Sequence, residues 1–326
     1  MKKSLVICLV IALGLSIASS ASAGKKNWPK ALAFGTGSVG GSAYPACMAY
    51  AYVVTKYLGV PATCETSGGF INNTKLVHMK KLLMGHTAQG ASWNGFHGKT
   101  WAKGKKYNNI RAAYAIYPQL WHGWTLSKYN ITKLSDLNGK VVSGGPRGGT
   151  SDAYTQWILK ELGIKPKRYV YAGFGDTVGM LRDGHIHAAF ASTAVPMPAA
   201  NEVTSTLNGV ILGFDDKEQQ KKAADAFPYL PGYTLPAGVY KGQDKPVLVN
   251  ADWVVISVNK EVDEDFVYNV VKVVMEHNKE LVAGHKALKN AVPENSKYIM
   301  LPLHKGAYRY FKEKGIEVPK AAMPID

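Results

Sequence analysis

Residues 31–45 read Ala-Leu-Ala-Phe-Gly-Thr-Gly-Ser-Val-Gly-Gly-Ser-Ala-Tyr-Pro, which is a short apolar run followed by a glycine-rich loop. A helix is predicted from about Tyr44, because Pro45 fits a first helical turn, where a missing backbone N–H costs little. A strand, a glycine-rich loop and a helix in succession are typical of βαβ units. This stretch therefore predicts an α/β protein.

The same succession recurs at two further places in the chain. The predicted strand, loop and helix are, in order, 62–65, 67–69 and 71–83 at the first place, and 141–143, 144–149 and 150–162 at the second. In the helix at 71–83 the apolar residues Leu76, Val77, Leu82 and Leu83 are expected on one face. Further strands are predicted at 187–191 and 253–258, and further helices at 176–182, 263–281 and 305–314.

A chain of 326 residues with 46% hydrophobic and 19% charged residues can bury a core large enough for two domains. Ile110–Ile116 and Trp121–Leu126 are predicted strands on either side of Tyr117-Pro118, which we interpret as a hinge crossing. We therefore expect a two-lobed, periplasmic-binding-protein (type II-like) architecture. The predicted lobe 1 is residues 24–116 plus 251–326, and the predicted lobe 2 is residues 117–250.

The first 23 residues are typical of a secretory signal peptide. Lys2 and Lys3 form a basic start, residues 5–17 are apolar, and Ala21-Ser22-Ala23 is an A-x-A cleavage site. We expect export to the periplasm through the Sec pathway, with cleavage after Ala23. No later apolar run approaches the roughly 20 residues needed to span a bilayer.

The chain is strongly basic, with 39 Lys+Arg against 23 Asp+Glu and a net charge of +16. Its basic residues are scattered, whereas a nucleic-acid-binding protein concentrates them in a stripe or patch. We therefore expect no nucleic-acid partner. A cationic surface outside the cytoplasm favours encounters with small anions.

Cys47 and Cys64 are the two cysteines that remain after the signal peptide. Export makes a disulfide between them chemically feasible, and two buried free thiols are the alternative. Two cysteines without a nearby paired-histidine motif do not make a zinc site, and no metal or cofactor is expected.

The three glycine-rich loops are the strongest functional signal, because each lies between a strand and a helix. The first turn of a helix has unpaired N–H groups and a positive partial charge, and so attracts a carboxylate or phosphate. When several such ends meet between two lobes, they form a binding cleft. A single loop of this kind can equally be a simple turn, so the prediction depends on all three together.

Enzyme motifs are weak by comparison. Gly35-x-Gly37-x-x-Gly40 matches the dinucleotide fingerprint, with Glu65 at the end of the next strand. The signal peptide, however, lacks the twin arginines expected for export of a folded, cofactor-loaded enzyme. No G-x-S-x-G elbow, H-E-x-x-H helix or Walker loop occurs in the sequence. The protein is therefore not expected to be an enzyme.

Several ordered motifs resemble the TAXI family of solute receptors for TRAP transporters. The motifs are Gly35-Thr36-Gly37-Ser38 with Gly40-Gly41-Ser42 and Tyr44-Pro45, Ser67-Gly68-Gly69 with Asn72-Asn73, Tyr117-Pro118, Leu134-x-x-Leu137-x-Gly139-Lys140-Val141, Gly145-Pro146-x-Gly148-x-Thr150, Pro236-Ala237-Gly238-x-Tyr240-x-Gly242-Gln243 and Leu303-His304-x-Gly306-Ala307-x-Arg309-Tyr310. Together they cover nearly the whole mature chain.

The resemblance implies a periplasmic receptor that closes two lobes on a small solute and passes it to TRAP-type membrane subunits. Glutamate and 2-oxoglutarate represent the implied ligand class, a small organic acid or amino acid. The sequence departs from the family pattern at His86-Thr87-Ala88-Gln89-Gly90-Ala91 and at Thr193-Ala194-Val195-Pro196. Both departures lie near the expected pocket.

The residues themselves suggest how such an anion would be held. Arg147 is the only cation inside a glycine-rich loop and can pair with a carboxylate through its guanidinium fork, unless it projects to solvent. Hydroxyl donors are expected from Ser38, Ser42, Ser67 and Thr150, backbone N–H donors from Gly37, Gly41, Gly69 and Gly149, a polar contact from Gln89, and apolar or stacking walls from Tyr44, Tyr117 and Phe174.

Two other functions use the same cleft. An exported enzyme acting on a small anion would turn its ligand over. A ligand-sensing subunit that docks on a signalling membrane protein would bind the ligand without contributing to uptake.

Overall fold

The computed structural model describes residues 27–36, 43–67 and 69–325. The predicted signal peptide and four predicted ligand contacts, Gly37, Ser38, Gly41 and Ser42, lie outside these residues. Within the described ranges, no helix combines the length and the apolar character needed to cross a membrane.

A single mixed sheet runs through the molecule. Its strands are β1 (Leu32–Thr36), β2 (Ala62–Thr66), β3 (Met84–Ala88), β4 (Ile110–Leu126), β5 (Val141–Ser143), β6 (Arg168–Tyr169), β7 (Ala188–Thr193), β8 (Gly209–Leu212), β9 (Gly232–Leu235) and β10 (Val247–Asn259). Their order is β2-β1-β3-β10-β4-β7-β5-β6, with β8 beside β4 and β9 beside β10. Parallel groups around β1 and β5 are thus joined by the antiparallel pair β4 and β10.

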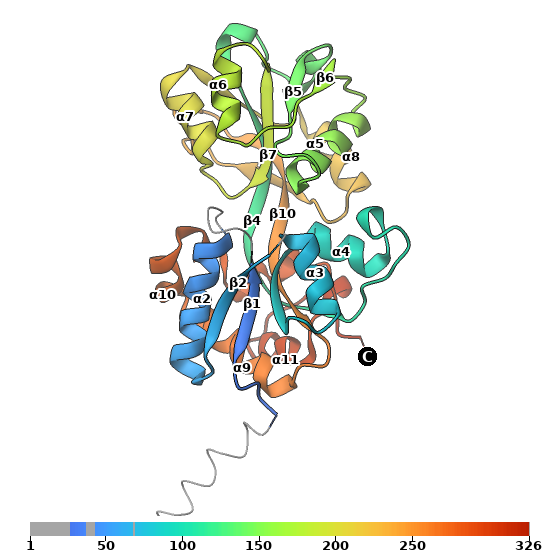
Figure 1. Cartoon of the computed structure of the whole chain (residues 1–326), viewed down its shortest axis with the longest axis vertical. Coiled ribbons are helices and arrows are strands. Elements are labelled where there is room, and N and C mark those ends of the chain that lie inside the picture. The colour runs from blue at the N-terminus through green and yellow to red at the C-terminus, as the bar shows by residue number, and fades with distance from the viewer. Residues whose placement is uncertain (1–26, 37–42, 68, 326) are drawn as a thin grey trace, which may run out of the picture.

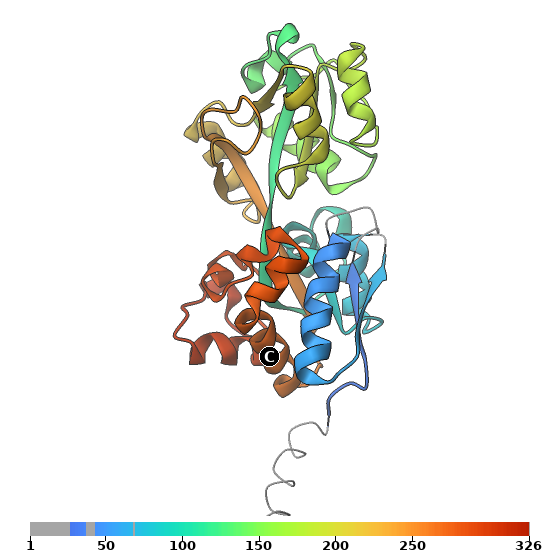
Figure 2. The ribbon, with the colours of Figure 1, turned by 90° about the vertical axis from the view of Figure 1, so that its left-hand side faces the viewer.

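The helices gather into two lobes, which β4 and β10 connect (Figures 1 and 2). Lobe 1 contains β1 to β3 with α2 (Ala43–Leu58), α3 (Phe70–His78), α4 (Gln89–His97), α9 (Glu264–Glu276), α10 (Asn278–Gly284) and α11 (Lys305–Glu313). Lobe 2 contains β5 to β7 with α5 (Thr150–Glu161), α6 (Asp176–Arg182), α7 (Pro198–Thr206) and α8 (Lys217–Ala226). The predicted two-lobed α/β architecture is confirmed, while the exact lobe boundaries stay a prediction.

The crossing strand β4 is continuous over 17 residues, so the prediction of two strands separated by Tyr117-Pro118 was wrong. Pro118 pairs with Trp253 of β10, and the pairing of β4 with β7 begins only at Leu120. Pro118 therefore lies where one edge of β4 has no partner strand among the described residues. A proline, which donates no backbone hydrogen bond, is tolerated at such an edge.

Two predicted helices also end earlier than expected. The helix α3 ends at His78, so Leu82 and Leu83 lie beyond it; Lys80 adopts a left-handed φ of 57° in the turn that follows. The predicted helix at 263–281 is two helices, α9 and α10, separated at His277. Sequence periodicity continues across both breaks and therefore did not reveal them.

Cys47 of α2 and Cys64 of β2 form a disulfide, which settles the choice left open by the sequence. The bond ties the first helix of lobe 1 to the edge strand of the sheet. It closes a segment with a sequence separation of 17 residues.

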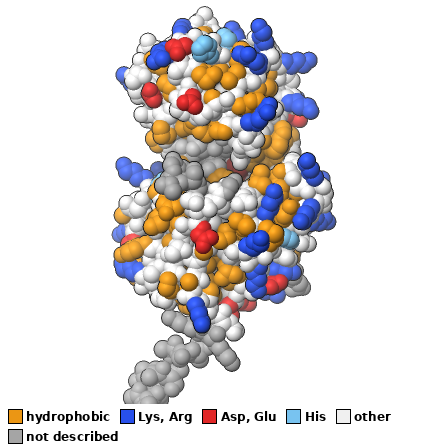
Figure 3. Space-filling model, viewed as in Figure 1, with side chains coloured by type: hydrophobic (Ala, Val, Ile, Leu, Met, Phe, Trp, Pro, Cys, Tyr) orange, Lys and Arg blue, Asp and Glu red, His pale blue; other side chains and the backbone are white. Residues whose placement is uncertain are grey.

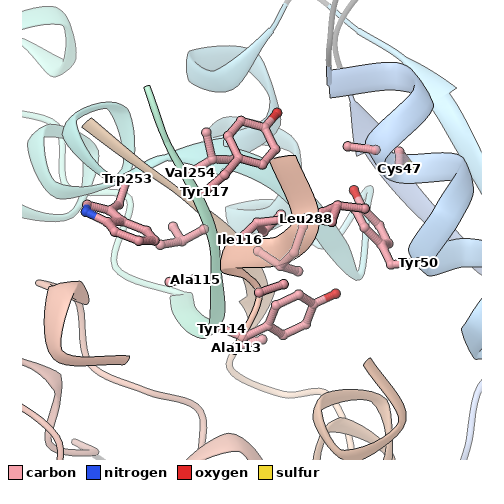
Figure 4. Packing of buried hydrophobic residues seen from close by; sticks show 14 of the residues in the cluster. Cys47, Tyr50, Ala113, Tyr114, Ala115, Ile116, Tyr117, Trp253, Val254 and Leu288 are labelled. Carbon is pink, nitrogen blue, oxygen red and sulfur yellow. The ribbon is translucent and has the colours of Figure 1, made fainter. Parts of the chain in front are cut away.

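The crossing strands are covered on both faces. Every residue of β4 except Pro118 is buried. Figure 4 shows Tyr50 of α2 and Leu288 near Tyr114 and Ile116 of β4. Strands covered on both faces lose the alternation of polar and apolar residues, and this buried pair of strands connects the lobes.

Candidate ligand-binding cleft

A cavity of about 1370 Å³ lies between the two lobes. Lobe 1 contributes Pro45 of α2 and residues of the 279–287 segment, which includes most of α10. Lobe 2 contributes Phe174-Gly175, residues 193–199 and Glu202 of α7. Figure 3 shows a hollow waist between the lobes with hydrophobic side chains along its borders. Ligand pockets are typically about 300–1,000 Å³, so this space accommodates a small solute.

Phe174, a predicted wall residue, does line this cavity. Its ring lies edge-on to Trp124, with centroids 6.5 Å apart. It also covers Gly145, where an added Cβ would lie 2.5 Å from the Phe174 ring. Gly145 has a φ of 95°, so both backbone conformation and packing require glycine there. Tyr44, a second predicted wall residue, is half-buried next to the cavity-lining Pro45 but is not part of the described lining.

Tyr117 of β4 does not line the cavity and lies in a buried cluster with His86. Its hydroxyl is 3.3 Å from Nε2 of His86, and the hydroxyl of Tyr50 is 3.2 Å from Nδ1. Burial lowers the pKa of His86 to about 3, with a smaller contribution from His285. The imidazole is therefore neutral near pH 7, with one ring nitrogen as donor and the other as acceptor. Tyr117 also stacks on His285, a cavity-lining residue, with centroids 6.2 Å apart.

Ser67 and Gly69 organise the start of α3. The hydroxyl of Ser67 lies 2.7 Å from the carbonyl oxygen of Thr36 and 2.6 Å from Oδ1 of Asn73, and it accepts the N–H of Gly69 at 3.1 Å. Gly69 has a φ of 85°, a conformation that favours glycine. These contacts join the end of β1 to α3, at the edge of lobe 1 that faces lobe 2.

Arg147, Gly149 and Thr150 lie together at the start of α5. The side chain of Arg147 is exposed, and its guanidinium lies over the ring of Tyr171 at 4.8 Å. The N–H of Gly149 donates to the carbonyl of Pro146 at 3.1 Å. None of these three residues lines the cavity described above, so their role as ligand contacts stays a prediction.

Gln89 is fully buried, and both ends of its side-chain amide are bonded within lobe 1. Its Nε2 donates to the carbonyl of Tyr298, and its Oε1 accepts the N–H of Met300 at 2.7 Å. These bonds attach the start of α4 to the C-terminal part of the chain. The predicted polar contact with a ligand would compete with them.

A buried contact between the lobes was not predicted from the sequence. Asp252 of β10 accepts the N–H of Gly90, at the start of α4, at 3.0 Å, and the hydroxyl of Tyr154 of α5 at 2.6 Å. Burial raises the pKa of Asp252 to about 7, although these hydrogen bonds oppose the shift. Beside them, Trp93 of α4 packs on Tyr229, with centroids 5.4 Å apart. Elements of both lobes therefore meet at one buried carboxylate.

A second buried chain of hydrogen bonds supports the cavity wall. The N–H of Met197 donates to the hydroxyl of Tyr240 at 2.8 Å, and that hydroxyl lies 2.8 Å from Nε2 of His122. Nδ1 of His122 lies 2.9 Å from the carbonyl oxygen of Leu120. Burial lowers the pKa of His122 to about 4, so the ring is neutral and can accept from Tyr240 while it donates to Leu120. These hydrogen bonds thus hold the cavity-lining segment 195–198 against β4.

The residues described by the structure contain no group of three or more His, Cys, Asp or Glu side chains that could hold a metal ion. The buried histidines and Asp252 are instead bonded to protein groups.

The comparisons with known proteins agree with this architecture. The model of the NMT1-like family matches residues 34–315. A TctC solute-binding protein from Polaromonas, solved without ligand, shares 12% identity with a TM-score of 0.55, over 81% of this chain and 88% of that one. MatC from Rhodopseudomonas palustris with bound malate shares 13% identity with a TM-score of 0.52, over 87% and 96%. The chain therefore belongs to the NMT1-like family and has the two-lobed fold of periplasmic solute-binding proteins.

Proposed function

We propose that this protein is the periplasmic receptor of a secondary transporter of the TRAP type, in its TAXI branch. It captures a small organic anion between its lobes and delivers it to the membrane subunits. The observation that carries this proposal is the cavity of about 1370 Å³, whose walls come from both lobes. The malate bound to MatC, a protein of the same fold, supports an organic acid as the ligand class.

Closure of the lobes is the expected mechanism. The lobes are joined by β4 and β10 and by the contact at Asp252, whereas the cavity separates Phe174 and α7 from α10. A rotation of one lobe relative to the other about β4 and β10 would bring the cavity walls together around the ligand. Such hinge closure needs changes at only a few element ends.

Arg147 is proposed to pair with the ligand's carboxylate when the lobes close. Its position at the start of α5 and its exposed guanidinium support this role. Arg147→Ala should then reduce affinity by about 1.5–3 kcal/mol, the range for a hydrogen bond to a charged group. Unchanged affinity in calorimetry would remove Arg147 from the site.

The receptor function is tested with mature protein beginning at Gly24. Glutamate, glutamine, 2-oxoglutarate and malate are titrated by calorimetry, followed by chromatography of the released ligand. One ligand bound per chain and recovered unchanged supports the receptor. Conversion of the ligand would indicate an exported enzyme instead. Binding with normal uptake in cells that lack the gene would indicate a sensing subunit.

A further inference from the structure

The cavity between the lobes has mainly apolar walls. Thirteen of its eighteen lining residues have no side chain that can form a hydrogen bond. The polar exceptions are Thr193, Glu202, Lys279, His285 and Lys286. Phe174, Val195 and Met197 of lobe 2 face the cavity together with Val282 of α10. Such walls favour a ligand that has apolar surface to bury.

The charged lining residues Glu202, Lys279 and Lys286 are exposed to solvent, and we call this exposed part of the cavity the mouth. Lys279 and Lys286 belong to lobe 1 and Glu202 to lobe 2, and none of the three is in an ion pair in the described structure. Burial lowers the pKa of His285, so this residue adds no charge at neutral pH. The mouth therefore has two cations and one carboxylate, whereas the buried and half-buried residues of the described lining include no Lys or Arg.

This placement discriminates between kinds of organic anion. A charged group buried without a partner is strongly unfavourable. A short dicarboxylate that fills the cavity would place one carboxylate at the mouth and the other against apolar walls. An anion with one charged end can leave that end near Lys279 and Lys286 and bury its remaining surface.

We propose that the ligand is an organic anion with a single charged end and an apolar aliphatic or aromatic body. This assignment rests on the receptor function proposed above. The body lies against Phe174, Val195, Met197 and Val282. The charged end lies at the mouth near Lys279 and Lys286, and Arg147 joins these two lysines when the lobes close.

The test compares two ligand classes by calorimetry at neutral pH. The apolar class is 4-methyl-2-oxopentanoate and phenylpyruvate; the polar class is 2-oxoglutarate and glutamate. We expect the apolar class to bind at least tenfold more tightly. Tighter binding of the polar class would overturn this assignment and leave the receptor function standing. Binding of neither class would overturn both.

Two matched pairs of variants locate the ligand. Val282→Thr keeps the shape of the side chain but adds a hydroxyl to the wall, and should weaken binding of the apolar class several-fold, whereas Val273→Thr, on α9 and outside the lining, should not. The double variant Lys279→Gln with Lys286→Gln should weaken binding about tenfold at low ionic strength, while Lys289→Gln should have no effect. Wild-type affinity in both cavity variants would overturn the assignment.

Discussion

The hydroxyl of Tyr154, on α5 of lobe 2, donates a hydrogen bond of 2.6 Å to Oδ2 of Asp252 on the crossing strand β10, and both residues are buried. The other oxygen of the same carboxylate accepts the N–H of Gly90, the second residue of α4 in lobe 1. One side chain thus connects elements of both lobes. It lies on β10, which itself joins them.

Removing the Tyr154 hydroxyl should destabilise the protein. Tyr154→Phe leaves a buried carboxylate without one of its donors, and such a loss costs about 1–3 kcal/mol. Urea unfolding at pH 7.5 measures the difference, with Tyr171→Phe, an exposed tyrosine of the same lobe, as the control. Equal unfolding free energies for the two variants would show that the contact contributes nothing.

A methyl group at Gly90 should disturb the same contact. An added Cβ would lie 2.0 Å from the Tyr154 hydroxyl oxygen and 2.7 Å from Cδ2 of Tyr229. Gly90→Ala should therefore destabilise by about 1–3 kcal/mol through overpacking.

Gly179 of α6 is the matched control for this substitution, because it is also helical. The nearest atom to its added Cβ is Nη2 of Arg182 at 3.9 Å. Gly179→Ala should stabilise by up to about 1 kcal/mol, since alanine favours the helix. If the two variants change the melting temperature in the same direction, the close approach of Tyr154 and Tyr229 to Gly90 does not determine how an added methyl group affects stability.

Asp252 should make stability depend on pH. Burial raises its pKa to about 7 from an ordinary value of 3.8, so between these values the folded protein holds a proton that the unfolded chain has released. Its contribution to stability is then present at low pH and declines as pH rises from about 4 to about 7, at up to about 1.4 kcal/mol per pH unit.

The comparison with Asp252→Asn isolates this contribution. His86 and His122 act in the opposite direction, because burial lowers their pKa values and their stabilisation is lost as pH falls below 6.5. Both proteins contain these histidines, so their effect cancels in the difference between the two unfolding curves. That difference should change from pH 4.5 to about pH 7 and level off above it. A difference that is constant across this range would mean that Asp252 is not protonated in the folded state.

The disulfide between Cys47 and Cys64 should stabilise the folded state mainly by restricting the unfolded chain. A closed loop of about this size contributes roughly 3 kcal/mol in the chain-entropy model. Replacing both cysteines by alanine should lower the unfolding free energy by about this amount. Reduced wild-type protein serves as the control for packing, because it keeps both sulfur atoms. A reduced protein as stable as the oxidised one would contradict the prediction.

Local features of the fold could be predicted from the sequence because they depend on neighbouring residues. The strand, glycine-rich loop and helix around residues 141–162 were recognised from apolar runs and turn residues, and β5 and α5 lie where expected. The break at His277 was not recognised, since the apolar pattern of α9 continues into α10.

The contact between the lobes depends on residues far apart in sequence. Gly90 and Asp252 are 162 positions apart, and no local pattern pairs them. One signal was present: Asp252 is a lone carboxylate within the apolar strand β10, and a buried carboxylate needs hydrogen-bond donors. The sequence could thus have identified the acceptor but not its donors.

The cavity walls were predicted only in part. Phe174 was identified, whereas in the 279–287 segment residues 279–281 were predicted as the end of a long helix, residues 282–287 were assigned to no element, and neither part was given a functional role. This segment becomes a wall only because α10 faces α7 of the other lobe. Four predicted contacts lie outside the described residues. Of the other nine, Phe174 lines the cavity, and eight lie outside its described lining: Tyr44, Ser67, Gly69, Gln89, Tyr117, Arg147, Gly149 and Thr150.

The most direct test of a ligand site between the lobes is to fill the cavity. Ala194 is a half-buried lining residue of lobe 2, and Ala194→Trp would place a large ring in the space the ligand needs. Calorimetry with the tightest-binding organic anion should give one site per chain for the wild type and no detectable binding for the variant, while both proteins melt cooperatively. Unchanged binding by a folded Ala194→Trp variant would contradict the account, because the ligand would then bind elsewhere.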